Sequence, residues 1–273
     1  MRTRIQRLGS CIWRARWPVY CEIMFFALVD VLYEIMRAVV APNTAGVHAS
    51  LRHAHDIARL EAALGLNIEA WAQRVTDQIA AAQFITTWYY TLSYTALFIG
   101  FFLILWFWQP SKYAFVRNWF WTTHAFALVA FWLYPSAPPR LANSGLIDTT
   151  KQALTLGGAL EWFQHLRNAY AAMPSLHIGL SFLYALTLVW LCTSWGRWRH
   201  VWWILPVWMT WVTMATANHY LLDGVAGVLT VLVALVLINK VAAHDVLRPW
   251  QRRRVATAPN EPSASRECTH GRT

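Results

Sequence analysis

The feature that most constrains this chain is a series of six apolar runs, each long enough, or nearly long enough, to cross the hydrocarbon core of a bilayer. A spanning helix needs roughly 17–25 apolar residues. Hydrophobic residues make up 57% of the 273 positions and charged residues only 13%, which is unlike a soluble domain. We therefore expect an all-α, polytopic membrane helical bundle with about six transmembrane helices. The expected spans are 21–40, 86–108, 119–134, 176–195, 201–217 and 224–241.

The distribution of basic residues orients this bundle. Most of the 23 Lys and Arg residues fall in the N-terminal segment, in the C-terminal part and in two short loops, one of which holds Lys112 and Arg117. Basic residues concentrate on the cytoplasmic side of membrane proteins, so we expect both termini to be cytoplasmic. The net charge of +10 then reflects topology and attraction to anionic headgroups, and no motif indicates binding of nucleic acid.

Three regions follow from composition. Residues 1–20 form a basic N-terminal segment, residues 21–243 a six-helix membrane domain, and residues 244–273 a polar, basic tail without periodicity that we expect to be disordered. Within the domain, residues 45–83 carry apolar side chains at helical spacing with charges between them, which predicts amphipathic helices at the outer interface. The four cysteines lack the paired spacing of a disulfide framework or a metal knuckle.

Polar blocks interrupt the apolar pattern at three places, all on the outer side in this topology. The first, "YPSAPPR", ends in Arg140; the second, "AAMPSLHIG", holds Ser175 and His177; the third, "NHYLLDGVAG", holds His219 and Asp223. Although these blocks are far apart in sequence, they can converge at one end of a helical bundle. We expect them to form one site.

Each block has a chemical interpretation of its own. His219 and Asp223 are four residues apart, which places them within side-chain reach on a helix. A carboxylate that accepts the Nδ1–H of the imidazole fixes its tautomer and leaves Nε2 able to attack an electrophile. Arg140 provides a permanent planar cation suited to phosphate oxygens.

The second block marks the start of a helix. Pro174 and Ser175 are typical of a helix entry, with Ser175 as the N-cap. The backbone N–H groups and the positive end of the dipole at such a start favour an anion. His177, in the first turn, is placed to donate a proton to a leaving oxygen.

Other interpretations of these residues stay open at this point. His177 and His219 can be structural groups that satisfy hydrogen bonds at helix ends, and together with Asp223 they also have the chemical types of metal ligands. The nearby arginine and the missing second carboxylate favour phosphate chemistry without a metal or another cofactor. Asp30, Glu34 and Arg37 fall on one stripe of the first span, either as an ion-pair network or as a part of the substrate site.

Taken together, the three blocks resemble those of the type 2 phosphatidic acid phosphatase superfamily, over roughly residues 113–237. Within it, "LEAALGLNIE" and the Tyr33–Arg37 spacing resemble the branch related to inositol phosphorylceramide synthases. The resemblance implies metal-independent phosphoryl transfer through a phosphohistidine. It implies His219 as nucleophile, Asp223 as its orienting carboxylate and His177 as general acid and base. Arg140 and Ser175 would bind the phosphate.

The sequence departs from the superfamily pattern at two cationic positions. Leu133 and Thr213 stand where many members have a lysine and an arginine, and the second block has leucine where many have glycine. The phosphate therefore has fewer assigned cations. Further candidate substrate contacts on the outer side are Arg167, Lys151 and Arg37, with Asn218 and Tyr220 beside the third-block histidine.

The predicted function is that of an integral membrane enzyme that acts on a lipid phosphate, with an extracytoplasmic active site, in what we expect to be a bacterial plasma membrane. One alternative is an inositol-phosphate-type phosphotransferase that moves a phospho-headgroup to an alcohol, since water and alcohols can both discharge a phosphohistidine. A second alternative is a transporter or scaffold that binds anionic lipid without chemistry. Membrane lipids are the only partners that the sequence indicates.

Overall fold

The computed structural model describes residues 19–142, 144–150 and 168–243, and within these ranges the chain forms helices and no strand. The predicted N-terminal segment up to residue 18 and the C-terminal tail lie outside the described residues. The α-helices are α2 (Val19–Val39), α3 (Thr44–Leu64), α4 (Glu69–Asp77), α5 (Ala80–Trp108), α6 (Pro110–Leu133), α9 (Leu176–Leu191), α10 (Ile204–Ala215) and α11 (Leu221–Ala243); the 3₁₀ helices are η1 (Pro139–Leu141) and η3 (Thr193–Trp203).

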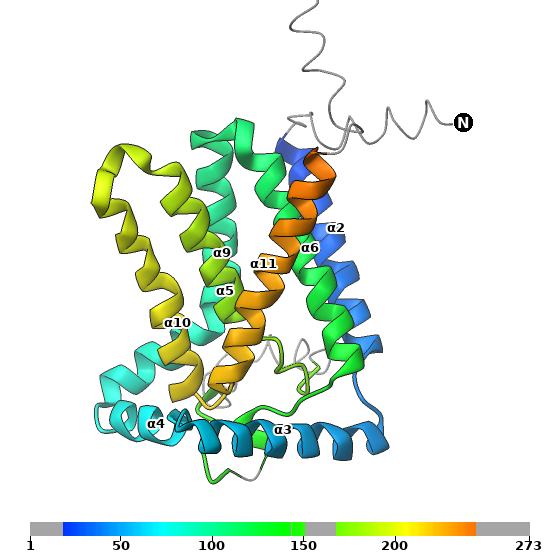
Figure 1. Ribbon diagram of the computed structural model, residues 1–273, viewed down its shortest axis with the longest axis vertical. Helices are drawn as coiled ribbons and strands as arrows, with labels where there is room; N and C mark the ends of the chain where they lie inside the picture. The colour runs from blue at the N-terminus through cyan, green and yellow to red at the C-terminus, as the bar shows by residue number, and fades with distance from the viewer. Residues whose placement is uncertain (1–18, 143, 151–167, 244–273) are drawn as a thin grey trace, which may run out of the picture.

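Six of these helices form a bundle, and they fall on the six apolar runs of the sequence. The bundle consists of helices that lie roughly along one common axis, namely α2, α5, α6, α9, α10 and α11 (Figure 1). Helix α3 lies across one end of the bundle, with α4 beside it. Helix α9 packs against α10 and α11, and α11 also packs against α6. The all-α bundle is therefore confirmed, as are helices within the amphipathic segment 45–83.

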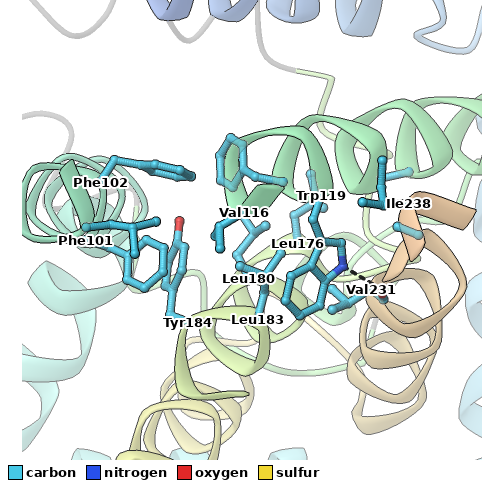
Figure 2. Packing of buried hydrophobic residues seen from close by; sticks show 14 of the residues in the cluster. Phe101, Phe102, Val116, Trp119, Leu176, Leu180, Leu183, Tyr184, Val231 and Ile238 are labelled. Carbon is cyan, nitrogen blue, oxygen red and sulfur yellow. Dashed lines mark hydrogen bonds between the residues drawn. The ribbon is translucent and has the colours of Figure 1, made fainter. Parts of the chain in front are cut away.

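A core of aromatic and branched side chains holds the bundle together (Figure 2). Phe101 of α5 packs on Tyr184 of α9, with ring centroids 4.4 Å apart. Trp119 of α6 is buried, and its indole N–H donates to the carbonyl oxygen of Val231 in α11 at 2.8 Å. This bond satisfies a buried donor and links α6 to α11 inside the core.

The outer surface of the bundle is apolar, which is the reverse of a soluble helical protein. On α2, Leu28 and Val39 are 69% and 70% exposed, while Glu22 is buried. By length and composition, α5 and the segment Leu221–Val241 of α11 can cross a membrane, and α9 is a shorter apolar helix. Of the six predicted spans, only those of α5 and α11 meet the criterion among the described helices. Helix α2 carries too many charges, α10 has only 12 residues, and α6 does not meet the criterion either.

Glu22, in the first turn of α2, points into the bundle. Nη1 of Arg117 in α6 lies 2.6 Å from a carboxylate oxygen of Glu22, and both side chains are almost fully buried. The hydroxyl of Tyr113 donates to the same carboxylate at 3.3 Å. Arg117, which the charge pattern assigned to the cytoplasmic side, thus has a buried partner on α2.

Glycines let α9 and α11 approach each other to backbone contact. A Cβ atom on Gly227 of α11 would lie 2.2 Å from the carbonyl oxygen of Ser175, and one on Gly179 of α9 would lie 2.9 Å from the carbonyl oxygen of Gly227. Real Cβ atoms do not come this close to backbone atoms. Only glycine allows this approach, which places the second and third polar blocks side by side.

We predict that Gly227→Ala destabilises the protein by about 3 kcal/mol, at the upper end of overpacking effects, because the clash is with backbone and not with a flexible side chain. Thermal unfolding in detergent measures the change. Gly100→Ala in α5 is the matched control, since nothing lies within 4 Å of its added Cβ. Equal stability of Gly227→Ala and wild type would contradict the close approach.

Candidate functional site

The three polar blocks meet at the end of the bundle that α3 covers, and main-chain hydrogen bonds join them. Ser136 of the first block donates its N–H to the carbonyl of Tyr170 at 2.9 Å, and its own carbonyl accepts the N–H of Ala172 at 3.2 Å. This isolated parallel bridge ties the first block to the second. The convergence expected from the sequence is therefore present.

The third block is joined to both of the others. The N–H of Ser175 in the second block donates to the carbonyl of Asp223 at 2.8 Å, and the N–H of Arg140 in the first block donates to the carbonyl of Ala217 at 3.1 Å. Ala217 has φ of 53°, a left-handed conformation that ends α10 and turns the chain toward His219. Each pair of blocks thus shares backbone hydrogen bonds.

His219 lies between two acceptors. Its Nδ1 is 3.0 Å from the carbonyl oxygen of Ala172 and 3.4 Å from Oδ2 of Asp223. Both side chains are buried, and Asp223 Oδ2 also accepts the N–H of Tyr220 at 2.9 Å. Because a backbone carbonyl can only accept a hydrogen bond, this geometry favours the tautomer with the proton on Nδ1 and the lone pair on Nε2. The sequence predicted the carboxylate but not the carbonyl of Ala172.

His177 lies next to His219, with ring centroids 5.8 Å apart. It stands in the first turn of α9, half-buried, where its ring stacks on that of Tyr90 at 4.4 Å and lies 5.6 Å from that of Tyr94. These tyrosines of α5 hold the imidazole by ring contacts. The structure thus brings together the two histidines that the sequence placed in separate blocks.

Arg140 reaches the site from η1 with two partners. Its Nε lies 3.1 Å from Oδ2 of Asp148, and its Nη1 donates to the side-chain oxygen of Asn218. Asn218 is fixed in turn because its amide group donates to the carbonyl and the hydroxyl of Thr216. Asp148 was missed by the sequence reasoning, since a lone acid in a loop gives no periodic signal.

Ser175 is the N-cap of α9, as predicted. Its hydroxyl accepts the N–H of Ile178 at 3.4 Å, and the residue is fully buried. Helix α9 therefore starts at the site, with the positive end of its dipole directed there.

The remaining candidate contacts differ in position. Arg37, at the end of α2, bonds both carboxylate oxygens of Glu34 through Nη1, at 3.1 and 3.2 Å. The side chain of Asn168 donates to the carbonyl of Arg37 at 3.3 Å, which places this end of α2 beside the approach to the second block. Tyr220 is buried next to Asp223, and burial together with that carboxylate raises its pKa. Arg167 and Lys151 lie outside the described residues.

The comparison with family models agrees with this geometry. The model of the PAP2 superfamily matches residues 55–237, from α3 to α11, and so includes all three polar blocks. The chain belongs to the PAP2 superfamily. It is therefore an enzyme of a family of phosphatases and phosphotransferases, which are typically bound to membranes. No match was found among curated proteins or among solved structures.

The matched region begins at residue 55, within α3, and includes α4. Both helices contact the loops around the candidate site. Nδ1 of His53 in α3 is 2.8 Å from the carbonyl oxygen of Pro135. The side chain of Gln73 in α4 bonds both the N–H and the carbonyl of Ile147, at 3.0 and 2.8 Å, and so fixes the neighbour of Asp148. The amphipathic pattern predicted these helices but not their contacts with the site.

The arrangement around His219 predicts its tautomer. We expect the neutral imidazole of His219 to carry its proton on Nδ1, because Ala172 and Asp223 both present acceptors there. Nitrogen NMR of protein labelled at histidine measures this, and His219→Gln identifies the signal. A protonated Nε2 in the neutral ring would contradict the geometry.

Proposed function

We propose that this protein is an integral membrane lipid-phosphate phosphatase or phosphotransferase that works without a metal, through a phosphohistidine on His219. The observation that carries the proposal is the placement of His219. Two acceptors lie beside its Nδ1, and the ring of His177 lies next to its own. Arg140 donates a hydrogen bond to Asn218, the residue before His219. Among the described residues, no group of three or more His, Cys, Asp or Glu side chains is arranged to hold a metal.

In the first step of the proposed reaction, Nε2 of His219 attacks phosphorus as the bond to the leaving oxygen of the lipid breaks. His177 donates a proton to that oxygen. Asp223 and the carbonyl of Ala172 stabilise the positive charge that develops on the imidazole of His219. Arg140 and the start of α9 neutralise the phosphoryl oxygens.

In the second step, water or an alcohol attacks the phosphohistidine. His177 takes the proton of the incoming oxygen, the phosphorus–nitrogen bond breaks, and its electron pair returns to Nε2. The catalytic residues are the same for both acceptors. The choice between hydrolysis and transfer therefore depends on what binds next to His177.

A membrane position supports a lipid as the substrate. The apolar outer surface of the bundle suits hydrocarbon, and the six helices would form six spans. The site lies at the end covered by α3 and α4, where Leu60, Leu64 and Trp71 are 52%, 58% and 51% exposed. An amphipathic segment of this kind lies at the interface, the depth of a lipid phosphate. In the predicted orientation this is the extracytoplasmic face.

The nucleophile prediction is tested by phosphate release from phosphatidic acid, a polyprenyl pyrophosphate and phosphatidylinositol in detergent with EDTA. We expect release from at least one of them by wild type, and a loss of at least about 10⁴-fold in His219→Ala, the scale found when a nucleophile is removed. His48→Ala, an exposed histidine on α3, is the matched control. Full activity of His219→Ala, or activity that EDTA abolishes, would refute the mechanism.

The acceptor is tested by product analysis with and without myo-inositol. We expect inorganic phosphate as the main product in both conditions, since water is the acceptor at hand. Formation of an inositol phosphate at the expense of phosphate release would instead assign a transferase, in line with the resemblance of "LEAALGLNIE" and of the Tyr33–Arg37 spacing to inositol phosphotransferases. Binding of anionic lipid without any product would leave the transporter or scaffold.

A further inference from the structure

Two buried carboxyl groups from the outer segment contact the first turn of α11. Glu61 of α3 accepts the N–H of Leu222 at 2.7 Å, and Glu69 of α4 accepts the N–H of Leu221 at 3.3 Å. Their exposed fractions are only 1% and 5%. Neither residue belongs to the three polar blocks, and neither is used in the proposed reaction.

These bonds complete a series at the start of the helix. The N–H groups of Tyr220, Leu221 and Leu222 are held by the carboxyl groups of Asp223, Glu69 and Glu61 respectively. The first N–H groups of a helix have no partner within it, so each needs an outside acceptor when buried. Here two of the three acceptors come from a segment more than a hundred residues earlier in the chain.

The two glutamates also lie close to each other. Glu61 is within hydrogen-bonding reach of Glu69, while its Oε2 has no donor among the described residues. Burial, then Glu69 and more weakly Asp223, raise the pKa of Glu61 to about 9. A proton on one of the two carboxyl groups would relieve the repulsion between the glutamates and would still leave an oxygen of Glu61 to accept the N–H of Leu222.

The position of this contact matters for the site because Asp223 is in the same turn. A shift of the first turn of α11 would move Asp223 against His219 and would loosen the bond from Ser175 to the carbonyl of Asp223. A misplacement of about 1 Å is enough to cost a catalytic group on the order of 100-fold in rate.

We infer that Glu61, with Glu69 as its partner, is a positioning residue that fixes the first turn of α11 and thereby holds Asp223 and His219 in their working geometry. The inference rests on the proposed function for its catalytic consequence. The segment of α3 and α4 would then have two roles: it lies at the membrane interface, and its glutamates hold the first turn of α11 in position.

The test compares Glu61→Ala, Glu61→Gln and the control Asp56→Asn, which changes an exposed acid on the same helix. We expect Glu61→Ala to lower kcat by about 10- to 100-fold with KM within about twofold, because the substrate contacts stay. Glu61→Gln retains an oxygen that accepts the N–H of Leu222, so it should keep most of the activity. Equal loss in both variants, or none in Glu61→Ala, would overturn the inference.

A second measurement uses pH. The titratable groups around Glu61 are Glu69, Asp223 and Tyr220. Between pH 4.5, the ordinary pKa of a glutamate, and about 9, the unfolded chain has lost the proton that the folded chain keeps. Stability therefore falls as the pH rises through this window. We expect the melting temperature in detergent to fall less from pH 5 to 9 in Glu61→Gln than in wild type. Equal slopes would contradict the shared proton.

Hydrogen exchange separates failure of the inference from failure of the proposed function. In Glu61→Ala, the amides of residues 220–223 should exchange at least tenfold faster than in wild type, and in Asp56→Asn at the wild-type rate. This holds whether or not the protein transfers phosphate. A wild type without phosphoryl transfer but with this exchange pattern would overturn the proposed function alone, whereas unchanged exchange would overturn the inference.

Discussion

The close approach of α9 and α11 is the constraint on which the rest of the site depends. Gly227 faces the carbonyl of Ser175 at a distance that admits no side chain, and Gly179 faces Gly227 from the other helix. Once the two backbones touch, the N-cap of α9 lies beside the first turn of α11. His177 and His219 are then neighbours without any long side chain having to reach across.

The site is held mainly by backbone groups and by α3 and α4. Main-chain bonds join each pair of polar blocks, so backbone groups provide the first set of links between the blocks. Glu61 and Glu69 also accept hydrogen bonds from the first turn of α11, and Gln73 bonds the backbone of Ile147. An amphipathic segment that suits the lipid interface on one side thus has a second face made of hydrogen-bonding groups directed at the site.

Features that depend on neighbouring residues were predicted from the sequence, whereas most contacts between distant residues were not. The helices were found because apolar periodicity is local, and the Ser175 cap because capping has a local signature. The meeting of His177, His219 and Asp223 was inferred from topology and resemblance. The carbonyl of Ala172 and the ion pair of Asp148 were not found, because a backbone acceptor has no residue type and an isolated acid has no pattern. Glu61 lies in "LEAALGLNIE", which the resemblance singled out, but a resemblance does not reveal which groups its carboxylate contacts. Arg117 was assigned to the cytoplasmic side, but its buried partner Glu22 was not found, because a charge pattern does not reveal which residues pair.

The ion pair between Arg140 and Asp148 has a consequence for the kind of anion that the guanidinium accepts. A ligand that takes the place of this carboxylate exchanges one anion for another, and the free-energy gain is the difference between two attractions to the same cation. A phosphate monoester with two negative charges competes better for this cation than a diester with one. If the proposed function holds, a headgroup would bind Arg140 only where its attraction to the guanidinium exceeds that of Asp148.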